Sequence, residues 1–191
     1  ASYARHSYVP APFTIYENTH KLEAGKILTI DENANLSFQS YWSLPEIVQD
    51  SLQNPLELSD AEHLESLETL LKDSVKRRMI ADVPLGAFLS GGIDSSLVAS
   101  LMQAQSLEKI KTFSIGFYED GFNEAHHAKK VAQHLGTDHT ELYVDSKIAQ
   151  KVIPTLSHLY DEPFADVSQI PTYLVSEMTR KHVTVALSGD G

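Results

Sequence analysis

The residues best suited to chemistry lie in one stretch, residues 83–96, which reads V-P-L-G-A-F-L-S-G-G-I-D-S-S. An apolar run, Val83–Leu89, stops at Ser90, and a helix is expected to begin at Ile93. A glycine turn between a strand and a helix directs unpaired backbone N–H groups and the positive end of the helix at an anion. Gly91 and Gly92 allow positive φ values and a close approach of the backbone. The stretch therefore predicts a phosphate-binding loop.

The side chains at the predicted helix start extend this interpretation. A carboxylate beside a phosphate is favourable mainly when Mg²⁺ lies between them, so Asp94 is expected to bind Mg²⁺. Ser90, Ser95 and Ser96 add hydroxyl groups. The loop is neither the nucleotide-triphosphatase loop, in which a Lys follows the glycines, nor the G-x-G-x-x-G dinucleotide turn. A plain strand-to-helix turn is the alternative, which the D-S-S helix start disfavours.

Two further turns follow predicted strands. In T-F-S-I-G-F, residues 112–117, Gly116 is expected to end the apolar run, and the backbone near Ser114 and Ile115 is suited to reading an adenine edge. A plain glycine turn is the competing interpretation there. In A-L-S-G-D-G, residues 186–191, a strand again leads to Ser-Gly and a carboxylate. Two such turns predict one site for a polyphosphate and Mg²⁺.

The elements around these turns alternate between strand and helix. Strands are expected at 83–89, 111–117, 139–144 and 183–187. Helices are expected at 93–103, at 124–135 with Gly136 as a left-handed cap, at 146–160 with a kink or a split at Pro154, and at 169–181. This alternation predicts an α/β fold, in which a parallel sheet has helices on both faces and binds ligands at the carboxyl ends of its strands.

The chain before this region has a different character. Residues 1–44 read as short strands and turns, with a hairpin-like loop at 31–35, and are interpreted as the tail of a domain that begins upstream. Residues 45–58, which contain Pro45 and Pro55, are expected to be a linker. The capping box at Ser59–Glu62 predicts a helix to about Met79 whose basic last turn suits its negative end. The predicted organisation is therefore 1–44, 45–80 and 81–191.

Composition limits the class of protein. The 191 residues carry a net charge of −11 and no Cys, which excludes disulfides and thiolate sites and argues against nucleic-acid or acidic-membrane partners. No segment resembles a membrane span or a signal peptide, so a cytoplasmic protein is expected. Among the nine His, His126, His127, His134 and His139 flank one predicted helix, and solvated surface positions are favoured over a zinc site. A first residue that is not Met and an end at Gly191 predict a fragment.

Four stretches carry a family resemblance: L-S-G-G-I-D-S-S, F-S-I-G-F, D-E-P-F-A-D-V-S-Q-I-P-T-Y and V-A-L-S-G-D-G, in this order. The first resembles the loop of ATP pyrophosphatases, and together they resemble the synthetase domain of glutamine-hydrolysing asparagine synthetases. S-Y-V-P-A-P-F-T-I-Y-E-N and K-L-E-A-G-K are similar to the end of that family's glutaminase domain. The resemblance implies an adenine nucleotide alpha hydrolase-like, Rossmann-like fold after a β-rich tail of an N-terminal nucleophile-type domain.

The resemblance also implies an activity and site residues. The family adenylates the side-chain carboxylate of aspartate with ATP and Mg²⁺, releases pyrophosphate, and lets glutamine-derived ammonia displace AMP. By position, Asp94 would bind Mg²⁺, and Asp190, often Glu in the family, would act in forming the adenylate. Asp161–Asp166 would line the acceptor-substrate side, with a plain acidic loop as the alternative. The other implied nucleotide contacts are Leu89, Ser90, Gly91, Gly92, Ile93, Ser95, Ser96, Ile115, Gly116, Ser188 and Gly189, besides Asp94 itself.

Departures from the family pattern leave alternatives open. The family's glutaminase uses an N-terminal Cys, which these residues lack, and further catalytic residues would lie beyond Gly191, so the fragment is expected to bind nucleotide weakly without turnover. A homodimer of the full-length protein is one expectation. The alternatives are a relative that amidates another carboxylate, such as a sugar acid, or closes a β-lactam, and a non-catalytic nucleotide-binding module.

Overall fold

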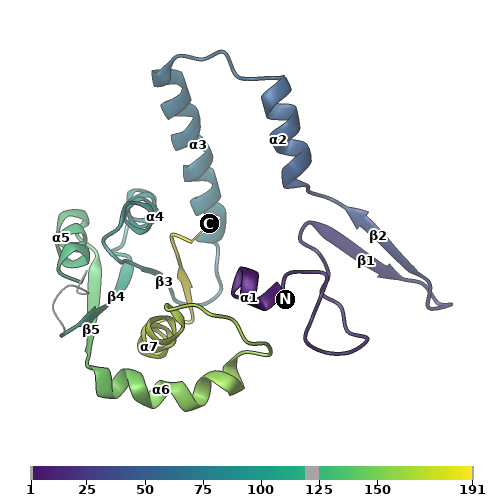
Figure 1. Cartoon of the computed structure of the whole chain (residues 1–191). Coiled ribbons are helices and arrows are strands. Elements are labelled where there is room, and N and C mark those ends of the chain that lie inside the picture. The colour runs from purple at the N-terminus through teal and green to yellow at the C-terminus, as the bar shows by residue number, and fades with distance from the viewer. Residues whose placement is uncertain (1, 119–124, 191) are drawn as a thin grey trace. The chain divides into compact units, whose positions relative to one another are not determined.

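The computed structural model describes residues 2–118 and 125–190, and Figure 1 shows its elements. The chain divides into two compact units, one formed by Ala1–Ser59 with Ser157–Asp166 and the other by Asp60–Leu156 with Val167–Gly191. Each unit is described by itself. The three-part division expected from the sequence stays a prediction.

The second unit contains a four-stranded sheet. Its strands are β3 (Leu85–Phe88), β4 (Lys111–Phe117), β5 (Asp138–Val144) and β6 (Val185–Leu187), in the order β5-β4-β3-β6. All three pairings are parallel. Because β3 and β6 are neighbours, the turns that follow them emerge at the same edge of the sheet. The parallel sheet expected from the sequence is confirmed.

Helices cover both faces of this sheet (Figure 1). On one face, α3 (Asp60–Arg78), α4 (Ile93–Ala104) and α5 (Ala125–Leu135) enclose a core that includes Ala87 and Leu89. On the other face, α7 (Gln169–Thr179) packs against Phe113, and α6 (Ser146–Leu159) packs with α7 around Val144. Successive strand residues point to opposite faces, which is why Ala87 and Phe88 enter different cores. The α/β class is therefore confirmed.

Local expectations in this unit are met to differing degrees. β4 has the predicted bounds, and Gly136 has a φ of +73°, as expected of a left-handed cap. The expected split at Pro154 is wrong, because α6 runs through this residue as one helix. Gly116, expected to end the apolar run at a turn, instead lies inside β4, where it pairs with Tyr143. Glu124, the predicted start of α5, lies outside the described residues.

The first unit contains less β structure than expected. Its strands β1 (Lys26–Ile30) and β2 (Leu36–Ser40) form an antiparallel hairpin around the predicted polar loop. Most of the expected linker is helical, because α2 (Leu44–Gln53) is a helix with Pro45 in its first turn. Proline is tolerated there because the first N–H groups of a helix have no intrahelical partner. Ser2–His6, expected as strand or turn, forms the short helix α1.

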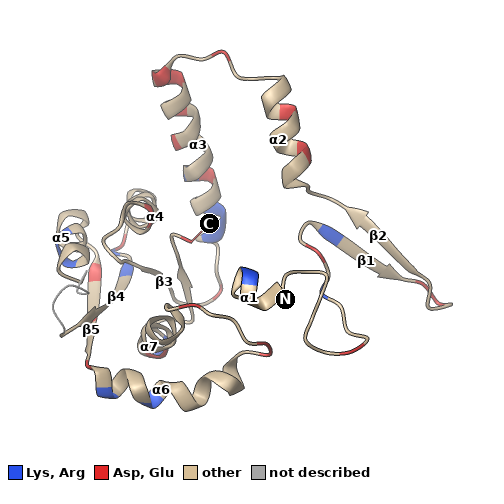
Figure 2. Cartoon of the chain, in the orientation of Figure 1, with Lys and Arg blue, Asp and Glu red and all other residues tan. Residues whose placement is uncertain are grey.

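Three of the four Lys and Arg residues of α3 lie in its last turn, Lys76, Arg77 and Arg78, and Figure 2 shows blue at this end of the helix. This confirms the predicted arrangement of cations at the negative end of a helix. Within the described residues, no helix has both the length and the apolar character needed to cross a membrane.

Candidate functional site

The predicted phosphate-binding loop connects β3 to α4. The loop backbone is tied to the sheet by Leu89 N–H, which donates to Phe113 O at 2.8 Å. Gly91 has a φ of +86°, and a Cβ on it would lie 2.6 Å from Ala128 N and 2.8 Å from the Cβ of His127. Only glycine fits there, because α5 packs directly against the loop. Gly92, expected at positive φ, has a φ of −71° and precedes the first helical residue instead.

The loop hydroxyl groups hold its shape. Ser90 Oγ and Ser95 Oγ lie 2.8 Å apart, and Gly92 N–H donates to Ser90 Oγ at 3.3 Å. The Ser95 hydroxyl lies 3.4 Å from Gly92 O. Ser96 Oγ is buried and has no hydrogen-bond partner among the described residues. The first turn of α4 is thus braced from within, with its positive end directed at the carboxyl edge of the sheet.

The turn after β6 lies on this helix start. A Cβ on Gly189 would lie 2.6 Å from Ser95 N and 2.9 Å from the carbonyl carbon of Asp94. In the same turn, Ser188 Oγ donates to Asp190 Oδ2 at 2.5 Å, and Asp190 N–H donates to Ser188 Oγ at 3.0 Å. The structure therefore brings the two Ser-Gly turns, and the carboxylates that follow them, together.

A cavity of about 420 Å³ opens at this junction. Its walls come from the two turns, from the ends of β3 and β4, and from the start of α7. The predicted site residues in its wall are Leu89, Ser90, Gly92, Asp94, Ser95, Ile115, Ser188, Gly189 and Asp190. A cavity of this size, with few polar groups converging on an apolar wall, is typical of a small-molecule site.

Four predicted site residues do not line the cavity: Gly91, Ile93, Ser96 and Gly116. Gly91 faces α5, as described above, and Ile93 is 86% exposed. Gly116 is buried inside β4. The lining of the cavity therefore gives no support to the nucleotide contacts expected of these four residues.

Sequence reasoning misses part of the wall. Phe88, Phe113 and Phe117 line the cavity, and so do four residues at and in α7, namely Ser168, Pro171, Thr172 and Val175. The signal for the α7 residues is present in the stretch D-V-S-Q-I-P-T-Y, which carries the family resemblance without itself indicating which of its residues face a ligand. Ser114, expected to contribute only its backbone, also lines the cavity.

The residues present fit a magnesium ion bound together with a phosphate. Asp94 and Asp190 both line the cavity, and Mg²⁺ is usually bound by one or two carboxylates plus substrate phosphates. Among residues 2–118 and 125–190, no group of three or more His, Cys, Asp or Glu is arranged to hold a metal on its own. A cation here would therefore depend on the oxygens of a bound ligand.

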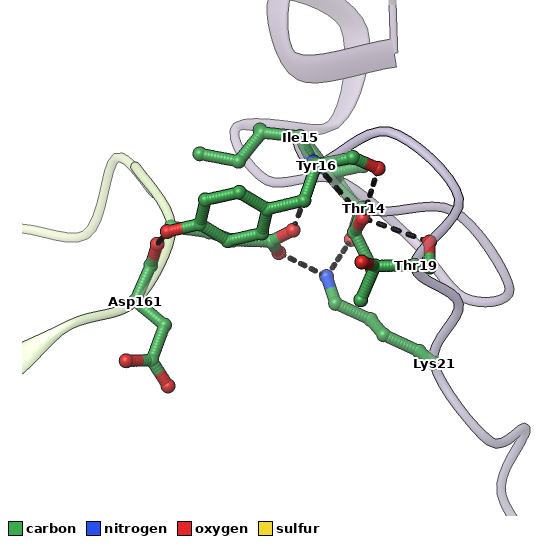
Figure 3. A network of polar contacts seen from close by, with 8 residues as sticks. Thr14, Ile15, Tyr16, Thr19, Lys21 and Asp161 are labelled. Carbon is green, nitrogen blue, oxygen red and sulfur yellow. Dashed lines mark hydrogen bonds and ion pairs between the residues drawn. The ribbon is translucent and has the colours of Figure 1, made fainter.

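The acidic loop Asp161–Asp166, a candidate for the acceptor side, belongs to the first unit and does not line the cavity. Glu162 forms an ion pair with Lys21 and accepts a hydrogen bond from Ile15 N–H at 2.8 Å, and Tyr16 OH donates to Asp161 O at 2.7 Å (Figure 3). The hydrogen bond from Lys21, with that from Ile15 N–H, lowers the pKa of Glu162. The Glu162 carboxylate is thus held as an anion within the protein.

His139 departs from the surface position expected of it. The ring is half-buried beside β4, with Nδ1 2.9 Å from Thr112 Oγ1 and Nε2 3.2 Å from Ser114 Oγ. Burial lowers the pKa of His139, so the neutral ring is favoured at neutral pH.

Comparison with known proteins gives consistent matches. Residues 66–191 match the asparagine synthase family. Asparagine synthetase [glutamine-hydrolyzing] 1 of Bacillus subtilis is 34% identical over 189 residues, which cover 99% of this chain and 29% of that protein. The protein named putative asparagine synthetase [glutamine-hydrolyzing] 2 of Methanocaldococcus jannaschii is 44% identical over 186 residues, which cover 96% of this chain and 35% of that protein. The chain thus spans about a third of the length of these relatives.

Similar solved structures include the NH3-dependent NAD synthetase from Campylobacter jejuni. It shares 14% sequence identity and a TM-score of 0.42, over 68% of this chain and 56% of that one.

Proposed function

The chain belongs to the asparagine synthase family, and we propose that it carries the ATP-binding part of an amide-forming ligase that adenylates the side-chain carboxylate of aspartate. In this reaction a carboxylate oxygen attacks the α-phosphorus of ATP, the bond from that phosphorus to the β-phosphate oxygen breaks, and pyrophosphate leaves. Ammonia derived from glutamine then attacks the acyl carbon, AMP leaves with its oxygen, and the nitrogen loses a proton to give asparagine.

One observation carries the proposal: the two Ser-Gly turns meet at the start of α4. The backbone of Gly189 is so close to Ser95 N that no side chain fits between them. Residues of both turns, the start of α4 with its positive end, and two aspartates therefore line one cavity. A site for anions that also holds carboxylates is best explained by a polyphosphate bound together with a divalent cation.

The chain's own residues bind and align the reactants. The start of α4 and the two turns, with their lining residues Ser90, Gly92 and Ser188, would hold phosphate oxygens. Ile115 with Phe113 offers an apolar wall for the base. Mg²⁺, held through Asp94 and Asp190, would supply neutralisation of phosphate charge. Alignment and charge stabilisation account for most of the catalysis in phosphoryl-type transfer, so no general base need be assigned. The net charge of −11 makes such local donors necessary.

The test is ATP–pyrophosphate exchange by the intact protein, measured with and without aspartate. We expect aspartate-dependent exchange that falls at least a hundredfold in Asp94→Asn, a loss on the scale found for removing one group that stabilises transition-state charge, about 10²–10³. Asp82→Asn is the matched control, since Asp82 is an exposed Asp of the same unit that does not line the cavity.

Each other result has a distinct meaning. Exchange that does not depend on aspartate but is stimulated by another carboxylate would assign a different acceptor to the same nucleotide site. Binding of ATP with Mg²⁺ but no exchange with any acid would leave a non-catalytic nucleotide module. Equal loss of exchange in Asp82→Asn would show that the effect of Asp94→Asn is not specific to the cavity.

A further inference from the structure

A chain of buried polar side chains leads from the wall of the cavity into the sheet. Ser114 lines the cavity but is only 3% exposed, and its hydroxyl lies 3.2 Å from Nε2 of His139. Nδ1 of the same ring lies 2.9 Å from Thr112 Oγ1, which lies 2.8 Å from Thr137 Oγ1. One imidazole therefore holds two hydroxyl groups of β4 at once.

The register of the sheet creates this arrangement. Thr112 is the partner of His139 across β4 and β5, and Ser114 lies two residues further along β4. Residues two apart on a strand face the same side, so a ring opposite the first hydroxyl also reaches the second. His139 thus acts across the strands on the residue immediately before Ile115, which lines the cavity as well.

The surroundings make the hydrogen bonds important. The core on this face includes the buried Ala128 and Ala132 of α5, and burying hydroxyl groups beside apolar residues is costly unless each finds a partner. Thr112 is fully buried, and Ser114 nearly so. Both are satisfied by the same ring, so loss of that ring leaves a buried polar group at the wall of the cavity.

The charge on the ring decides which hydrogen bonds are available. A neutral imidazole has one donor and one acceptor nitrogen, whereas an imidazolium has two donors and cannot accept a proton from either hydroxyl. Burial lowers the pKa of His139; Glu141 on the same strand opposes this shift, and Lys129 on α5 adds to it. From β4 the ring meets the uncharged Thr112 and Ser114.

We propose that His139 is a positioning residue for the nucleotide site, which in its neutral form fixes Ser114, and through it the end of β4, at the wall of the cavity in the arrangement that binds ATP. The inference rests on the proposed function in taking this cavity as the ATP site. His139 itself does not line the cavity, so it acts through Ser114.

The first test is a double-mutant cycle on the intact protein, with the dissociation constant of ATP measured by calorimetry in the presence of Mg²⁺. We expect His139→Gln and Ser114→Ala each to weaken binding about three- to tenfold, the effect of one hydrogen bond. The double variant should bind ATP no more weakly than the single variant with the lower affinity, because both substitutions remove the same interaction. His134→Gln, at an exposed position on α5, is the control and should bind as the unchanged protein does.

The second test needs no substitution of His139. Burial lowers the pKa of His139, so binding of ATP by the unchanged protein should weaken only as the pH falls below the ordinary His pKa of 6.5 and the ring takes up a proton. ATP itself titrates in this range, so the informative quantity is the difference from Ser114→Ala, whose binding should depend less steeply on pH.

Several results would overturn the inference. The first is an unchanged affinity for ATP in a His139→Gln variant that has a native circular dichroism spectrum. The second is a loss of affinity in the double variant that equals the sum of the two single losses in free energy. The third is a pH dependence of ATP binding that is the same in the unchanged protein and in Ser114→Ala. If the unchanged protein binds no ATP at any pH, the proposed function fails as well, and that outcome is recognised without any substitution.

Discussion

The contact between Gly189 and the start of α4 gives the sharpest prediction. In Gly189→Ala the added Cβ would lie 2.6 Å from Ser95 N, whereas ordinary van der Waals contact begins at 3.4 Å, so the turn must move by roughly 0.8 Å. The φ of Gly189 lies outside the left-handed region, so the substitution acts by crowding and not by backbone strain. Crowding against backbone cannot be relieved by rotating a side chain.

The size of the effect follows from hydrogen-bond geometry. A shift of this size would lengthen a hydrogen bond of about 2.9 Å to roughly 3.7 Å, which is beyond the useful range. Losing one such bond to a charged phosphate costs about 1.5–3 kcal/mol, or about a tenfold to hundredfold rise in the dissociation constant of ATP. Calorimetric titration with ATP and Mg²⁺ measures this rise, and circular dichroism checks the fold.

Gly136→Ala is the matched control. Gly136 has a φ of +73°, and a Cβ added there would have no atom within 4 Å, so alanine should lower stability through strain but leave ATP affinity unchanged. If Gly189→Ala binds ATP within a factor of two of the unchanged protein, the two turns do not form one phosphate site, and the reasoning behind the proposed function is refuted.

Three further predictions concern the pair on the acidic loop, the core and the metal. Lys21→Met should lower the thermal midpoint of the protein, because it removes the ion pair with Glu162. A carboxyl group with a depressed pKa stabilises the fold only while ionised, so the unchanged protein should lose stability as the pH falls from 4.5 through the lowered pKa of Glu162, and the variant should lose less. An unchanged acid-unfolding curve would contradict this. Met102→Ala, at a side chain 1% exposed, should cost about 2–5 kcal/mol in urea unfolding, against less than about 0.5 for the exposed Leu107→Ala, and similar values would show that the described core is wrong. Asp94→Asn should bind ATP more weakly than the unchanged protein with Mg²⁺ but more tightly in EDTA, and the same sign under both conditions would exclude a metal-binding role.

The sheet and most of its helices can be predicted because their signals are local. β4 has the bounds predicted from its sequence, and Gly136, a residue type that favours the left-handed conformation, follows the end of α5 as expected. The helix α2 escapes prediction because Pro45 reads as a breaker, although in the first turn of a helix proline removes no hydrogen bond. Proline thus breaks a helix in its interior but is tolerated one turn earlier, in the first turn.

The parts of the site that escape prediction depend on tertiary structure. Thr172 and Val175 reach the cavity only because α7 packs on the face of the sheet opposite α4. In the sequence His139 resembles a surface residue, because nothing in its neighbourhood along the chain shows that β4 will present two hydroxyl groups to it. Periodicity predicts elements, whereas cross-strand register, which decides such contacts, is set by the packing of the whole sheet.

The composition of the cavity wall explains why Mg²⁺ should reverse the effect of Asp94→Asn. None of the lining residues that the structure describes is Lys, Arg or His, whereas Asp94 and Asp190 both belong to the wall. Without a divalent cation, these carboxylates repel the phosphates, and backbone N–H groups and hydroxyls must act against them. With the cation, the same carboxylates would become the groups that hold it. In an acidic chain of net charge −11, we expect a site built this way to bind the metal complex of a nucleotide more tightly than the free anion, since only the complex offsets the charge already present.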